Sequence, residues 1–434
     1  MKIKTSISLT GMTSKYPISG ILVAIGLVLL SPFVSAYLSY IAFLICIYRI
    51  IRHDAKVFAA DYAVLIPVSQ FMRTTGGMSF VIWLCLIAAI WHFIRGKIQV
   101  GGALLSLLLL LNYLLVRMQT NVSGFVLCFG QMFVLYVLLT KQDTDSSVRV
   151  ANGFCWSLLL TSIYALLLRN APQIELIRGP ESPAIWGTNI MRFSGLIKDP
   201  NYYMTLLLVG LACMCKLKET GRIRSVRFWV SAVAFTALGV LTYSKTFFLV
   251  FILLGGLYII WQFWSKKVFK GMFFTSMAVV AGLFLLLSEY SPFAVVIERF
   301  TSSDSLSDIT TGRTDLFKTY WNVISENAFN FLFGKGLDAP VLEKGTHNLF
   351  LEIVYHIGFA GFTMMAVFYG SIISSIHKCT GGVNKQSIIA QYIVVFIMFV
   401  QYMALQGMFQ LITYAGFFVA ILSVNITEKV CDEN

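Results

Sequence analysis

The composition predicts an all-α polytopic membrane protein. Of the 434 residues, 58% are hydrophobic and only 12% are charged, and the mean hydropathy is +0.79. A soluble domain has roughly 45–50% apolar and roughly 25% charged residues. Half of the usual charge cannot cover a soluble surface, so most of the chain must face lipid or other helices. Soluble enzyme folds are therefore excluded.

Apolar runs predict the elements in order along the chain. A membrane-spanning helix needs about 20 predominantly apolar residues. A weaker run at 59–71 is interrupted by Asp61 and Pro67, which is typical of a broken or re-entrant segment. The clear candidates are 21–34, 37–51, 80–94, 98–116, 124–139, 154–168, 203–215, 228–243, 246–263, 272–287, 349–376, 388–405 and 409–424.

The net charge of +13 predicts the topology of these spans. Lysine and arginine collect in short gaps between apolar runs, as the positive-inside rule requires of cytoplasmic loops. If 59–71 is a span, all of the basic clusters fall on the same side of the membrane. If it is not a span, the clusters that precede it fall on the opposite side from the later ones. We therefore expect fourteen spans, or twelve to thirteen with a partly inserted terminal hairpin, and both termini in the cytoplasm. The clusters are Arg49/Arg52/Lys56, Arg95/Lys97, Lys216/Lys218/Arg222/Arg224/Arg227, Lys266/Lys267/Lys270 and Lys378/Lys385.

Two long loops then lie on the external side. Residues 169–199 hold three of the nine prolines and are expected to be irregular and lid-like, whereas 289–346 hold three more acids than bases and a helical stretch at 316–324. Loops longer than about 15 residues in a compact fold are usually functional or disordered. The expected division is a bundle at 1–168, a loop at 169–199, helices at 200–288, a large loop with short helices at 289–346, and helices at 347–434.

The first candidate site is the stretch 192–201 at the end of the first loop. Asp199 before Pro200 is the pattern of a helix N-cap followed by proline in the first turn. With Arg192 nearby, the free N–H groups and positive dipole end of this helix would form a cradle for phosphate or pyrophosphate. The alternative is a capped membrane helix with an unrelated loop arginine.

Two further polar stretches lie at predicted external boundaries. Lys245, in 242–246, either extends along apolar surface towards the interface or faces a cavity. Arg313 heads a helix that is followed by a glycine-rich turn and by the pair His347–Asn348. Histidine titrates near pH 6.5, so His347 could act as a general base for a sugar hydroxyl. The alternative is a histidine that caps a helix at the interface.

Other chemistries lack their motifs. The chain has no H-E-x-x-H, no Walker A and no G-x-S-x-G sequence, so metal-dependent transfer and ATP hydrolysis are disfavoured. On a continuous helix, His356 would point away from His347, and the two could not share a metal. The basic residues also do not form the aromatic-interleaved face that nucleic-acid binding needs.

Five of these motifs, in this order, resemble the O-antigen ligase and polymerase superfamily of WaaL and Wzy types. They are R-F-S-G-x-x-x-D-P-N at 192–201, S-K-T at 244–246, G-R-T-D-x-x-x-x-x-W at 312–321, G-K-G at 334–336 and H-N-x-x-L-E-x-x-Y-x-x-G-x-x-G at 347–361. The resemblance covers roughly residues 190–365. It implies a glycosyltransferase C-like helical membrane enzyme whose donor is a glycan linked to undecaprenyl diphosphate, without a cofactor, nucleotide sugar or metal.

The resemblance also implies roles for single residues. His347 matches the histidine that deprotonates the acceptor hydroxyl, and Arg192 and Arg313 match arginines that hold the pyrophosphate leaving group. Lys245 stands where many relatives have arginine, which keeps the charge but loses the bidentate geometry. Arg299 is a further pyrophosphate candidate without a motif match. Residues expected to support the site are Asp199, Pro200, Asn201 and Asn348.

The expected function is polymerisation of lipid-linked oligosaccharide repeat units into O-antigen, capsule or exopolysaccharide, at the outer face of the bacterial inner membrane. The alternative is a ligase that moves finished glycan to lipid A-core or another acceptor, because the motifs of the two overlap. A flippase or transporter is disfavoured, since it predicts inverted repeats and charges inside several spans. The expected partners are the glycan donor and acceptor, membrane lipids and a chain-length regulator, with no nucleic acid.

Overall fold

The computed structural model describes residues 19–71, 79–96, 101–173, 183–185, 188–265, 272, 312–342, 345–379 and 388–427. The regular elements in these residues are helices, apart from one short antiparallel hairpin formed by β1 (Pro183–Ile185) and β2 (Thr188–Met191). The prediction of an all-α polytopic membrane protein is confirmed.

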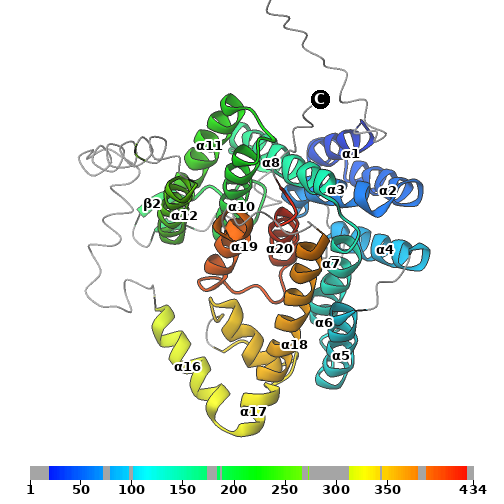
Figure 1. Ribbon diagram of the computed structural model, residues 1–434, viewed down its shortest axis with the longest axis vertical. Helices are drawn as coiled ribbons and strands as arrows, with labels where there is room; N and C mark the ends of the chain where they lie inside the picture. The colour runs from blue at the N-terminus through cyan, green and yellow to red at the C-terminus, as the bar shows by residue number, and fades with distance from the viewer. Residues whose placement is uncertain are drawn as a thin grey trace, which may run out of the picture.

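The helices fall into three groups along the chain (Figure 1). The first group is α1 (Ser19–Leu30), α2 (Tyr37–Arg52), α3 (Ala55–Leu65) with the 3₁₀ turn η2 (Ile66–Val68), α4 (Phe80–Arg95), α5 (Gly102–Arg117), α6 (Val122–Phe125), the π-helical turn η3 (Val126–Gly130), α7 (Gln131–Leu139) and α8 (Thr144–Leu167). The second is α10 (Pro200–Glu219), α11 (Ser225–Val240) and α12 (Lys245–Trp264). The third is α16 (Arg313–Ser325), α17 (Ala328–Phe333), α18 (Leu349–Cys379), α19 (Ile388–Tyr402) and α20 (Leu411–Ser423).

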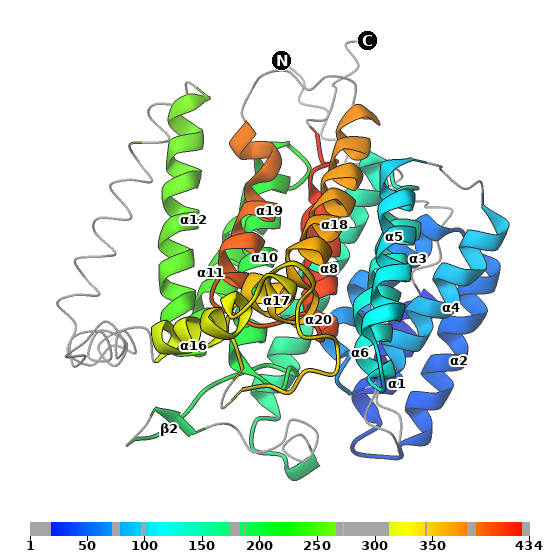
Figure 2. The ribbon, with the colours of Figure 1, turned by 90° about the horizontal axis from the view of Figure 1, so that it is seen from below.

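Four described helical stretches are long and apolar enough to cross a membrane, namely Val122–Leu139, Thr144–Leu167, Lys245–Trp264 and Leu349–Ile376. Shorter apolar helices accompany them, and most run in nearly the same direction as α12 and α18 (Figure 2). The expected span 272–287 lies outside the described residues except for residue 272, so the count of fourteen stays a prediction.

The weak span at 59–71 is part of a longer element that connects the two ends of the bundle. The helix starts at Ala55, and η2, which contains Pro67, continues it. Near its start the Lys56 ammonium contacts the Asp143 carboxylate at 2.5 Å. Past its end Gln70 Oε1 accepts a hydrogen bond from the Lys198 N–H at 2.7 Å. The element therefore reaches both ends of the bundle, and its role as a membrane span stays a prediction.

Asp61, which interrupts that run, is paired inside the bundle. Arg49 Nε donates to Asp61 Oδ2 at 2.7 Å and a second guanidinium nitrogen donates to Oδ1 at 2.9 Å, and both residues are buried. An unpaired carboxylate in this environment would be costly, and the bidentate pair removes that cost. Arg49, expected in a basic cytoplasmic gap, instead lies in the interior as the partner of Asp61.

The other end of the bundle carries the candidate site, and we call it the site end. Helices α10, α12 and α18 begin there and α5 ends there. In Figure 2, α16 lies across the direction of α12 and α18 at this end. Within 169–199, where irregular chain is expected, residues 183–185 and 188–191 form the hairpin β1–β2, residues 192–199 are irregular, and 174–182 and 186–187 lie outside the described residues. Pro183 is tolerated because a two-stranded hairpin consists only of edges, where a missing N–H need not break a ladder.

Candidate active site

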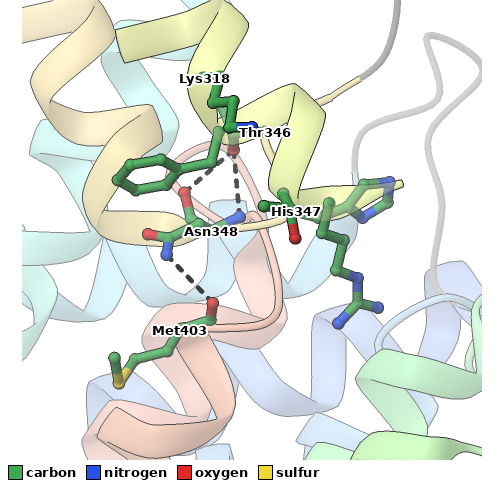
Figure 3. Close-up of a pocket in the computed structure, with 8 residues that line it drawn as sticks. Lys318, Thr346, His347, Asn348 and Met403 are labelled. Atoms are coloured by element: carbon green, nitrogen blue, oxygen red, sulfur yellow. Dashed lines mark hydrogen bonds between the residues drawn. The ribbon is translucent and has the colours of Figure 1, made fainter. Parts of the chain in front are cut away.

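A cavity of about 470 Å³ lies between α16, the start of α18 and the chain after α19. Two cationic side chains, the expected base and polar groups from separate segments all face it. Figure 3 shows these side chains. The residues that line it are Arg313, Thr314, Phe317, Lys318, Thr346, His347, Asn348 and Met403.

His347 lines the pocket from a constrained backbone. Its φ is +48°, in the left-handed region that few residues other than glycine adopt, although histidine is among those enriched there. Helix α18 begins only at Leu349, so His347 is not helical and the argument from helical phase between His347 and His356 does not apply. Thr346 Oγ1 donates to the Asn348 carbonyl at 3.0 Å and so closes the turn around His347.

Asn348, expected near the site, joins two segments of the pocket. Its Nδ2 donates to the Met403 carbonyl at 3.1 Å, and its Oδ1 accepts from the Leu351 N–H at 3.0 Å (Figure 3 shows the first bond). One side chain therefore caps α18 and holds the chain after α19. In Figure 3 the His347 side chain points away from this network.

Glu352 holds the same segment one turn further along α18. Its Oε2 accepts hydrogen bonds from the N–H groups of Gly407 at 2.6 Å and Met408 at 2.9 Å. We call residues 403–410 the α19–α20 loop. The sequence argument did not select Glu352 for the site, although a carboxylate four residues after Asn348 in an apolar run was the signal that could have found it.

Arg313 brings the main positive charge to the pocket. It is the first residue of α16 and follows Gly312, whose φ of +76° suits glycine. Burial lowers the pKa of Arg313, which marks a cation with part of its hydration removed. Arg313 and Thr314 both lie in the first turn, so the positive end of the helix dipole adds to this charge. Lys318, missed by the sequence analysis, lines the same cavity.

The Arg192 motif forms a second cluster at the site end. Arg192 Nε donates to the Thr242 carbonyl at 2.8 Å, and its guanidinium also donates to Asn201 Oδ1 at 2.9 Å. Ser244 Oγ contacts the same Asn201 oxygen at 3.4 Å. The first two motifs of the sequence therefore meet in space and tie the start of α10 to the start of α12.

The predicted cap of α10 is confirmed. Asp199 accepts a hydrogen bond from the Asn201 N–H at 2.6 Å, and Pro200 is the first residue of the helix. Lys245 is the first residue of α12 and is half-buried. Neither Arg192 nor Lys245 is among the residues that line the cavity. Arg299 lies outside the described residues.

The α19–α20 loop links the two clusters. Tyr202, next to Asn201 on α10, donates from its hydroxyl to the Gln406 carbonyl at 2.9 Å. Asn348 and Glu352 hold the same loop from α18. A displacement of this loop would therefore disturb hydrogen bonds at the starts of both α10 and α18.

The glycine-rich turn 334–336 stabilises a break in α18. The break lies at Gly358, with φ +61° and ψ −177°. The N–H groups of Lys335 and Gly336 donate to the carbonyls of Tyr355 and His356 at 2.8 and 2.9 Å. These carbonyls would otherwise lack helical partners. The N–H groups of this turn are thus used within the protein.

Among the described residues, no group of three or more His, Cys, Asp or Glu side chains is arranged to hold a metal ion. No curated protein and no solved structure shows significant similarity to the chain. The family model Wzy_C, described as O-antigen ligase, matches residues 230–366. The matched stretch contains Lys245, Arg313, His347, Asn348 and Glu352. This match supports the resemblance of the chain to the O-antigen ligase and polymerase superfamily.

Proposed function

We propose that this protein polymerises oligosaccharide repeat units carried on undecaprenyl diphosphate. The observation that carries the proposal is one cavity lined by a histidine and two cations, Arg313 and Lys318. A base and a positively charged subsite are what transfer of a glycan from a diphosphate requires. The family match supports O-antigen ligase or polymerase chemistry in general.

In the proposed reaction, a hydroxyl of the acceptor sugar attacks the anomeric carbon of the donor glycan. His347 accepts the hydroxyl proton as the new glycosidic bond forms. The bond between the anomeric carbon and the diphosphate oxygen breaks, and undecaprenyl diphosphate leaves with the electron pair. Arg313 and Lys318 stabilise the negative charge that develops on this leaving group.

The second cluster contributes in a different way. Asp199 and Pro200 start α10, and Asn201 receives the Arg192 guanidinium. We propose that Arg192 and Lys245 extend the positive field for the diphosphate, and that Arg192 also holds α10 against α12. Arg299 remains a further candidate for the diphosphate. Charge stabilisation by these cations is the proposed substitute for a metal ion.

The proposed setting is the bacterial inner membrane with the site end facing outwards. The basic end would then be cytoplasmic, where Lys56 meets Asp143 and Arg222 meets Asp145. The division into a bundle at 1–168 and helices at 200–288 and 347–434, with loops at 169–199 and 289–346, is part of this proposal. A chain-length regulator is a further proposed partner.

A ligase is the second candidate, because the matched family is described as O-antigen ligase. The two differ in their acceptor: a polymerase adds glycan to another repeat unit, whereas a ligase adds it to a different molecule such as lipid A-core. Accumulation of single repeats on the final acceptor in a null strain indicates a polymerase. Long lipid-linked chains that never reach the final acceptor indicate a ligase.

Complementation of such a null strain tests the site. His347→Ala, Arg313→Ala and Arg192→Ala are expected to leave the null product pattern on a glycan gel. Lys198→Ala removes an exposed cation close to the second cluster and serves as the matched control, with wild-type chains expected. Wild-type chain lengths from His347→Ala at equal protein levels would exclude His347 as the base.

A further inference from the structure

Helices α16 and α17, in a segment between predicted membrane spans, expose several large apolar side chains. Phe329 is 58% exposed, and Leu332 and Phe333 on α17 are also open. On α16 the exposed rings of Phe317 and Trp321 stack at a centroid distance of 6.2 Å. Apolar patches of this kind mark contact with a partner or with a membrane.

The exposed surface of α16 has an apolar aromatic side and a polar side. Phe317 and Trp321 flank the face that packs on α18 through Tyr320 and Ile324. The exposed residues on the opposite side are polar and include Thr319 and Asn322. A helix with apolar aromatics on one side and polar residues on the other is typical of the plane of a membrane interface. Figure 2 shows α16 lying across the spanning helices, as such a helix should.

Hydrogen bonds to α5 fix the depth of α17 in the bundle. The Tyr113 hydroxyl donates to the Phe333 carbonyl at 2.9 Å, and the Arg117 guanidinium donates to the Gly334 carbonyl. The Leu337 N–H in turn donates to the Arg117 carbonyl at 3.2 Å. Tyr113 lies one turn inside the end of α5. The end of α17 is therefore level with the last turn of α5, not beyond it.

The last turn of α5, within the expected span 98–116, carries exposed aliphatic side chains. Leu115 and Val116 are 47% and 83% exposed immediately before Arg117. Exposed aliphatic residues on a membrane-spanning helix face hydrocarbon, and an arginine at its end extends towards the headgroups. Arg117 also lies over the Phe329 ring at 5.4 Å. The apolar surface of α5 thus continues onto α17 at the same depth.

We propose that α16 and α17 form an in-plane element docked in the lipid interface of the leaflet at the site end. Trp321, Phe329, Leu332 and Phe333 face the lipid, and the polar side of α16 faces water. Part of the segment between the spans is then a membrane element. Because α16 carries Arg313 and Lys318, this docking sets the cationic wall of the pocket at headgroup depth. That last consequence rests on the proposed function, and the docking itself does not.

Photocrosslinking in proteoliposomes tests the docking directly. The photoreactive residue p-benzoylphenylalanine is placed at Leu332 or Phe329, in vesicles of radiolabelled phosphatidylethanolamine and phosphatidylglycerol. Leu115 on α5 is the lipid-facing control, and Asn322 on the polar side of α16 is the water-facing control. We expect lipid adducts at 332 and 329 close to those at 115 and at least about fivefold above those at 322.

Adducts at 332 and 329 no higher than at 322 would overturn the proposal. So would adducts with added glycan or with a second copy of the chain in place of lipid. The readout needs no turnover, so it is repeated on His347→Ala. If lipid adducts form in both the wild type and His347→Ala but the wild type transfers no glycan, the proposed function is contradicted and the docking proposal is still supported.

Discussion

Two pairs of helix starts meet at the site end, and they use their polar residues differently. At α10 and α12, Arg192 is bonded to the Thr242 carbonyl and to Asn201. At α16 and α18, Arg313 has no hydrogen bond or ion pair to another described residue and lines an open cavity with His347. The first pair is joined by its arginine, whereas the second leaves its arginine facing the cavity. Similar motifs in a sequence therefore need not have equal roles.

The largest expected effect is at His347. His347→Ala should lower kcat by about 10²–10⁴-fold, the usual contribution of a positioned base. Transfer by purified protein in proteoliposomes measures it, with Thr319→Ala on the water side of α16 as control. A kcat within about twofold of wild type would remove His347 from the chemistry.

Lysine substitutions distinguish the proposed roles of Arg313 and Arg192. Arg313→Ala should cost about 10²–10³-fold in kcat, while Arg313→Lys keeps the charge and recovers part of the loss. Arg192→Lys keeps the charge but cannot reproduce the fork to Thr242 and Asn201, so its thermal stability should be as low as that of Arg192→Ala. Either substitution of Arg192 should lower the free energy of unfolding by roughly 1–3 kcal/mol. Equal recovery by lysine at both positions would contradict the difference drawn between the clusters.

Glu352 tests the loop that links the clusters. Glu352→Ala leaves the Gly407 and Met408 N–H groups without an acceptor, at roughly 1–3 kcal/mol each. Glu352→Gln keeps a side-chain oxygen and should recover most of the stability. Melting temperatures and transfer rates of both variants check this. If alanine and glutamine lower the melting temperature equally, the negative charge is what the loop requires.

Two glycines give a smaller, matched comparison. A Cβ at Gly334 would lie 2.6 Å from the backbone of Gly358 and of His356, and its φ is +70°. At Gly312 the φ is +76°, but among the described residues no atom beyond its chain neighbours lies within 4 Å of the added Cβ. Gly312→Ala should therefore cost only the left-handed strain of roughly 1–2 kcal/mol, and Gly334→Ala more. Equal melting temperatures of Gly312→Ala and Gly334→Ala would show that the turn at 334–336 accommodates the added Cβ without further cost.

The smallest effect is a pH dependence at Asp338. A hydrogen bond from the Thr120 hydroxyl, with others from backbone N–H groups at 119–121, lowers the pKa of Asp338 from 3.8 to about 2. A lowered carboxyl pKa adds stability that is present above pH 4 and is lost as the pH falls towards 2. The wild type should lose more stability than Asp338→Asn over that range. An equal loss of melting temperature in wild type and Asp338→Asn between pH 4 and pH 2 would contradict the lowered pKa of Asp338.

Much of the fold follows from the sequence because hydrophobic length and loop charge are local signals. The cap at Asp199 and the start of α16 near Arg313 were also predictable, since each depends on neighbouring residues. The break at Gly358 was not, because it depends on N–H groups donated from 334–336. The phase argument for His347 and His356 failed for a similar reason, since it assumed a helix that starts two residues later.

The candidate site was predictable only in part. His347, Arg313 and Asn348 were selected from motifs, and the structure brings them to one cavity. Lys318 was missed because it occupies a variable position of the motif at 312–321, and Met403 because it reaches the pocket from a distant part of the chain. Arg192 was selected, yet its bonds to Thr242 and Asn201 could not be read from spacing. Contacts between segments decide which polar residues stay open to a ligand.

The affinity for undecaprenyl diphosphate tests the central claim most directly, because it isolates the leaving group from the chemistry. Binding to purified protein in nanodiscs is measured for wild type, Arg313→Ala and His347→Ala. The account predicts a Kd about tenfold or more higher for Arg313→Ala, about 1.4 kcal/mol or more, and an unchanged Kd for His347→Ala. Wild-type affinity in Arg313→Ala would contradict the assignment of this pocket to the diphosphate.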